Sequence, residues 1–185
     1  GYLDSWIQYL DTPSISVGSG ASLSTKIFYA IEDPAGGQVA GTCTDGWDAA
    51  NIRISTDGGS TWDLLEDAMN PYDFECGYGW IWNDAQYDTD GSLNHLAPGW
   101  GGDTNDRWKD FSADLSAYEG MEVIIRFAFG SDPAYSTIDN SDITGFQVDA
   151  IKISDDSSPG FIFVDNGNDM SLMSPSGEVW TDQFY

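Results

Sequence analysis

The fold of this chain is decided by the stretch Val123-Ile124-Ile125-Arg126-Phe127-Ala128-Phe129. Every second residue from Val123 to Phe129 is large and apolar, and two of the three residues between them are apolar as well. A period of two is the spacing of a β-strand, and apolar side chains on both faces are typical of a strand inside a sheet. We therefore expect a central strand here.

Other stretches alternate in the same way. Leu23, Ile27, Tyr29 and Ile31 share one parity with Thr25, and Ile52 and Ile54 flank Arg53. In residues 146–153 the apolar parity changes between Val148 and Ile151, and a β-bulge near Asp149 would account for this slip. These segments predict several strands that each bury one face.

The composition favours many short strands joined by turns. The chain of 185 residues holds 8 Trp, 9 Tyr, 9 Phe and 21 Gly. Sustained helical periodicity is missing, so we expect at most a turn or two of helix, at 64–69 or 115–119. The predicted fold is all-β, a two-sheet antiparallel β-sandwich of the jelly-roll type. We expect one domain over 1–185, with 155–185 as a C-terminal hairpin, an edge-strand extension or a linker to a following domain.

The charge is strongly unbalanced. Thirty-one acidic residues face six Lys and Arg, for a formal net charge of -25. Such a surface repels nucleic acid and anionic lipid, and the chain holds no run of 18 apolar residues, so we expect neither nucleic-acid binding nor membrane insertion. Asp supplies 25 of the 31 acids. This excess indicates loops that bind calcium, or a surface that stays soluble in a salty habitat.

Two cysteines, Cys43 and Cys76, are too few for a thiolate zinc site. In an extracellular protein they would form one disulfide, and the alternative is two buried thiols. The chain starts at Gly1 without a signal sequence, and we interpret it as a processed or excised piece of a longer protein.

A hairpin motif follows the strand that ends at Ile54. Residues 55–62 fit the pattern S-x-D-x-G-x-T-W of an Asp-box. Asp57 can accept backbone N–H bonds within its own turn, Gly58 and Gly59 allow positive φ, and Trp62 can fold back over the hairpin. A single copy indicates a structural turn, since propellers repeat this box in every blade.

Several blocks of sequence together resemble a known family. They are Trp47-Asp48, the hairpin block 51–62, Trp108-Lys109-Asp110-Phe111, the segment 114–120, the strand 123–127 and Gly145-Phe146-Gln147-Val148-Asp149-Ala150-Ile151. In this order they resemble MAM-like jelly-roll domains, which accompany secreted immune inhibitor A-type metallopeptidases and many bacterial surface proteins. The resemblance covers most of the chain and concerns the fold more than any activity.

The resemblance implies a structural calcium ion held by acids at strand ends. By matching position, Asp48 and Asp149 are the acids carried over, and Glu32 is expected as a third ligand because it also ends a strand. Relatives often read Asp-Asp-Ile where this chain has Ala150 between Asp149 and Ile151, which weakens any role that needs both acids. The alternative is that Asp48 caps a turn and Asp149 bonds to backbone in its bulge.

Aromatic residues in the loop region between Glu66 and Trp108 suggest a ligand surface. We expect Tyr78, Trp80, Trp82 and Trp100 either to stack on sugar rings or to pack beneath the loops. A weaker acidic cluster, Asp84 with 88–92, resembles part of a calcium loop but has Gln86 at the first ligand position.

Catalytic patterns are weak. His95 is the single histidine, and the six Glu residues never form the E-x-D-x-x-E pattern of sandwich glucanases. We therefore expect a non-catalytic binding or adhesion module of a secreted or cell-surface protein, with a glycan or a cell-surface protein as partner. The alternatives are a carbohydrate-binding module of a glycan-active enzyme, a self-assembling structural subunit, and a carboxylate-dependent glycosidase.

Overall fold

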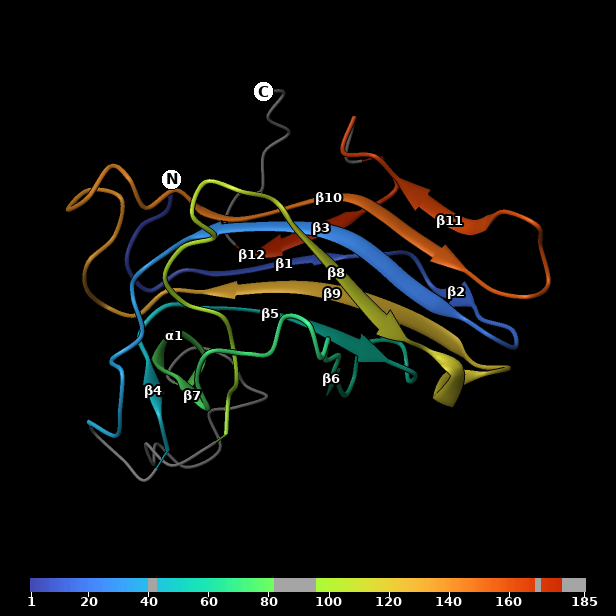
Figure 1. Ribbon diagram of the computed structural model, residues 1–185, viewed down its shortest axis with the longest axis horizontal. Helices are drawn as coiled ribbons and strands as arrows, with labels where there is room; N and C mark the ends of the chain where they lie inside the picture. The colour runs from blue at the N-terminus through green and yellow to red at the C-terminus, as the bar shows by residue number, and fades with distance from the viewer. Residues whose placement is uncertain (40–42, 82–95, 169–170, 178–185) are drawn as a thin grey trace.

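The computed structural model describes residues 1–39, 43–81, 96–168 and 171–177, and it contains two antiparallel sheets stacked face to face (Figure 1). The first sheet has the order β12 (Ser174–Gly177), β1 (Ile7–Asp11), β9 (Glu122–Gly130), β5 (Ala49–Ser55) and β6 (Asp63–Leu64), and β2 (Ile15–Ser16) also pairs with β9. The second sheet has the order β11 (Phe161–Asp165), β10 (Gly145–Ser154), β3 (Ser22–Ala30) and β8 (Lys109–Asp114). The predicted all-β sandwich is confirmed.

The chain crosses between the two sheets from one long strand to the next. It passes from β1 to β3, β5, β8, β9 and β10, and these strands belong alternately to the first and the second sheet. This alternation is the connectivity of a jelly-roll sandwich. As a result, residues far apart in sequence meet at the ends of the sandwich.

The core lies between the sheets and is built by alternate residues. Val123, Ile125, Phe127 and Phe129 of β9 are buried, and they face the second sheet, where Leu23, Ile27 and Tyr29 of β3 and Phe111 of β8 are buried too. The predicted central strand is confirmed, because β9 lies between β1 and β5.

The expected bulge in β10 is also confirmed. The register of β10 on β3 shifts between Asp149 and Lys152, and Ala150 within the shift has φ of 52°. The bulge explains why the apolar parity of this strand changes along its length.

Short helices occur at one predicted place and at one that we did not predict. A 3-10 turn, η1, covers Ser116–Tyr118, whereas residues 64–69 continue from β6 into turns. The α-helix α1 covers Tyr78–Ile81. Within the described ranges, no helix combines the length and the apolar character needed to cross a membrane.

A third layer covers the outer face of the first sheet. It contains α1 and the parallel pair β4 (Asp45–Gly46) and β7 (Cys76–Gly77), which lie below β5 in Figure 1. Its apolar residues form a second cluster with outward-facing residues of β5 and β9: Cys43, Ala49, Phe74, Cys76, Trp80, Ala97 and Ala128. The outer face of the second sheet differs, because its outward-facing side chains are exposed or half-buried.

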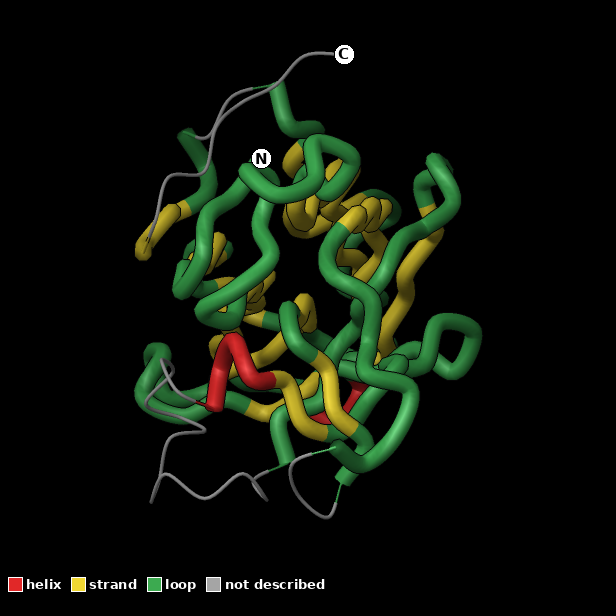
Figure 2. Tube along the Cα trace, turned by 90° about the vertical axis from the view of Figure 1, so that its left-hand side faces the viewer, coloured by secondary structure: helices red, strands yellow, loops and turns green. Residues whose placement is uncertain are grey.

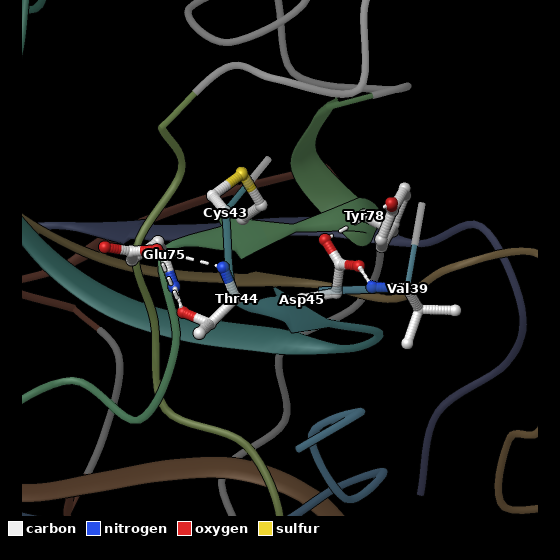
Figure 3. The surroundings of a disulfide bond; sticks show 7 residues. Val39, Cys43, Thr44, Asp45, Glu75 and Tyr78 are labelled. Atoms are coloured by element: carbon white, nitrogen blue, oxygen red, sulfur yellow. Dashed lines mark hydrogen bonds between the residues drawn. A yellow bond between two sulfur atoms is a disulfide. The ribbon is translucent and has the colours of Figure 1, made fainter. Parts of the chain in front are cut away.

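A disulfide closes this third layer. Cys43 and Cys76 are bonded to each other with Cα atoms 6.0 Å apart, and Glu75 accepts hydrogen bonds from the backbone and hydroxyl of Thr44 beside them (Figure 3). Of the two alternatives open from the sequence, the disulfide is the one present. A disulfide of this kind is typical of an oxidising compartment.

Candidate metal centre

Three carboxylates from separate strands converge at one end of the sandwich. Glu32 follows β3, Asp48 directly precedes β5, and Asp132 follows β9. One carboxylate oxygen of each lies within 4.8 Å of the others. Figure 2 views the molecule from this end, where loops from both sheets come together. The antiparallel pairing of Ala49 with Gly130 explains why the beginning of β5 and the end of β9 meet here.

Asp48 is the most enclosed of the three, with 0% of its surface exposed. The hydroxyl of the buried Tyr2 donates a short hydrogen bond to one of its oxygens, and the backbone N–H of Asp132 donates to the other at 3.0 Å. The Tyr2 ring packs edge-on against Phe129 with centroids 4.9 Å apart. These contacts hold the Asp48 carboxylate in one orientation.

The electrostatics of the cluster disfavour three negative charges. Burial, together with the nearby Asp132 and Asp48 carboxylates, raises the pKa of Glu32 to about 8. Burial likewise raises the pKa of Asp48 to about 7, although hydrogen bonds from Tyr2 and Asp132 oppose this shift. The pKa of Asp132 is raised by burial, and that of Tyr2 is raised by burial and by Asp48. A bound cation would offset this accumulation of charge.

The side chains present fit a hard divalent cation. Calcium binds six to eight oxygens, and three carboxylates with loop carbonyls are ligands of the right chemical type. The Oε2 atom of Glu32 is buried and has no hydrogen-bond partner, which a cation would supply. The cluster therefore fits the calcium that the family resemblance implies.

The structure brings together two of the three expected ligands. Glu32 and Asp48 belong to the cluster, whereas Asp149 lies in the β10 bulge and its Oδ1 accepts from the backbone N–H of Ala150 at 2.5 Å. Asp149 lies away from the cluster because it pairs with Lys26 in the middle of β3, whereas the cluster lies beyond Ala30 at the end of that strand. The third acid of the cluster is instead Asp132. Its position three residues after the predicted strand 123–129 was the signal that could have identified it.

The expected aromatic ligand surface is corrected by the structure. Tyr78, Trp80 and Trp100 are all buried. The Trp100 ring lies in the main core against Tyr29, with centroids 6.0 Å apart, and the Trp80 ring packs under the guanidinium of Arg53. These side chains therefore pack beneath the loops, the second of the two readings. Trp82, Asp84, residues 88–92 and His95 lie outside the described residues.

A groove remains in the described part of the loop region between Glu66 and Trp108. It has a volume of about 490 Å³, and Ala68, Pro71, Tyr72 and Pro98 are among its lining residues. A ligand could lie in this groove or on the outer face of the second sheet.

The hairpin at 55–62 has the expected internal bonds. Asp57 accepts from the backbone N–H groups of Ser60 and Thr61, both at 2.9 Å, and Gly58 and Gly59 have φ of 74° and 90°. The Trp62 ring lies over the Arg126 guanidinium at 3.9 Å, so the motif closes part of the outer face of the first sheet.

Comparisons with known proteins leave the family open. A scan against protein-family models and a search of curated proteins both found no match to this chain.

Proposed function

We propose that this chain is a non-catalytic binding or adhesion module of a secreted or cell-surface protein, and that calcium stabilises it. In this proposal it is a MAM-like jelly-roll domain whose Asp-box hairpin serves the fold. Its partner is a glycan or a cell-surface protein that lies on the surface of the sandwich.

One observation carries the proposal: the convergence of Glu32, Asp48 and Asp132 at an end of the sandwich. Asp48 is fully enclosed, and Tyr2 covers it from the side of the chain terminus. A metal ion held there would link the ends of β3, β5 and β9, and an ion that binds only the folded state stabilises that state. The disulfide agrees with an oxidising compartment outside the cell.

The test is the melting temperature in millimolar calcium compared with chelator. An ion that binds only the folded state stabilises it by about 2.7 kcal/mol at a concentration one hundred times its Kd. We expect calcium to raise the melting temperature of the wild type, and Asp48→Asn to abolish most of this increase while it keeps a partner for Tyr2.

Asp149→Asn is the matched control, because Asp149 is an acid outside the cluster, and it should keep the full calcium response. A melting temperature that calcium leaves unchanged in the wild type would contradict the calcium part of the proposal. Release of reducing ends from polysaccharides by the purified chain would contradict the non-catalytic part.

A further inference from the structure

The outer face of the second sheet carries ordered rows of side chains. Strand register places the outward-facing residues of β8, β3 and β10 side by side. These residues are exposed or half-buried. The rows, from one end of β3 to the other, are Trp108, Phe28 and Gln147; Asp110, Lys26 and Asp149; Ser112, Ser24 and Lys152; and Asp114, Ser22 and Ser154. The face is therefore polar in the middle and aromatic at one end.

Aromatic side chains stand at two opposite corners of this face. Trp108 is 42% exposed and leans on Phe28, with ring centroids 5.8 Å apart. At the far corner Phe161 of β11 is 52% exposed and lies under the ammonium of Lys152. Strand rise and strand spacing set the two corners about 25 Å apart along a diagonal of the sheet. An extended ligand could contact both corners at once.

The charge of the face indicates which kind of ligand this would be. Lys26 and Lys152 face three acids, Asp110, Asp114 and Asp149, so the rows carry one net negative charge in a chain of net charge -25. Long-range repulsion by the whole chain disfavours a polyanion, and a polycation would be drawn to the more acidic surfaces elsewhere. An uncharged partner is the one that this nearly neutral face fits.

We propose that the outer face of the second sheet binds an extended, uncharged polysaccharide along the diagonal from Trp108 to Phe161. The apolar face of a sugar ring stacks on each aromatic corner. Between them, Ser24 and the exposed ion pair of Lys26 with Asp110 exchange hydrogen bonds with the sugar hydroxyls. This inference rests on the proposed function as a binding module and names its ligand class and its surface.

The test is affinity electrophoresis of the whole chain in gels that contain hydroxyethyl cellulose, xylan, β-1,3-glucan or mannan, with alginate as the polyanion. We expect the wild type to be retarded by at least one neutral polysaccharide. Trp108→Ala and Phe161→Ala should each weaken this binding at least about tenfold, as truncation of an aromatic hot spot does. Both side chains are more than 40% exposed, so melting temperatures should show that the variants fold.

Two variants serve as controls and should bind like the wild type. Tyr135→Ala removes an exposed aromatic from the loop after β9, and Ala68→Trp fills the groove of the loop region. Full binding by both Trp108→Ala and Phe161→Ala would overturn the inference. Retardation of the wild type by alginate alone would overturn it as well.

Failure of this inference can be told apart from failure of the proposed function. Loss of binding in Ala68→Trp alone would move the ligand to the groove, which overturns the inference and leaves a binding module. Absence of retardation by every neutral polysaccharide also overturns it, while the calcium response of the melting temperature still tests the proposed function by itself.

Discussion

At the scale of single residues, Asp57 is the acid whose hydrogen bonds are best defined. Its carboxylate accepts from the hydroxyls of Ser55 and Thr61 as well as from two backbone N–H groups, and these bonds lower its pKa from 3.8 to about 2. Because the folded pKa lies below the unfolded value, the stabilisation is complete above pH 3.8 and is lost as the pH falls towards 2.

The lowered pKa of Asp57 makes its contribution to stability depend on pH. Asp57→Ala should lower the melting temperature at pH 6, and the difference from the wild type should shrink as the pH falls from 4 to 2. Thermal unfolding followed by circular dichroism over this range measures the difference. Asp63→Ala, an exposed acid just after the hairpin, is the control. A difference for Asp57→Ala that stays constant down to pH 2 would contradict the assignment.

Single residues of the candidate site were predictable only in part. Glu32 was expected because it ends a predicted strand and Asp48 because the family resemblance implies it, and both lie in the cluster. Asp149 adjoins no strand end, since it lies within β10 and pairs with Lys26 in the middle of β3. Burial of Trp80 and Trp100 could not be read from their spacing, because it depends on which sheet face their loop covers.

At the scale of elements, the disulfide links Cys76 of β7 to Cys43, which lies two residues before β4. The two cysteines are 33 residues apart, and β4 and β7 pair in parallel through Asp45 with Cys76 and Gly46 with Gly77. We predict that replacing both cysteines by Ala lowers the free energy of unfolding by about 2–4 kcal/mol, the usual effect of a disulfide that closes such a loop.

Urea unfolding of the double variant and of the wild type measures this difference. Reduced and alkylated wild type is the matched comparison and should lose a similar amount of stability. An unfolding midpoint that is the same in all three samples would show that the bond does not restrain the unfolded chain.

At the scale of the whole molecule, the net charge of -25 destabilises the compact state through repulsion. Raising the ionic strength from about 0.01 M to about 1 M shortens the Debye length from about 30 Å to about 3 Å and screens this repulsion. We predict that NaCl, added in the presence of chelator, raises the melting temperature steadily over this range. Sucrose at matched osmolality is the control for effects other than screening. A melting temperature that NaCl leaves flat or lowers would contradict this prediction.

The sequence by itself determined the fold class, because alternation at a period of two is a local property of each segment and already assigns one side chain in two to the core. It also determined the hairpin of residues 55–62, whose bonds all join residues close together in the chain. Tertiary structure alone decided which acids meet and which sheet face stays open. Asp132 reaches Asp48 across 84 residues, and the third layer covers one sheet and not the other. Both outcomes depend on how strands cross between the sheets, and no local pattern of residues encodes that connectivity.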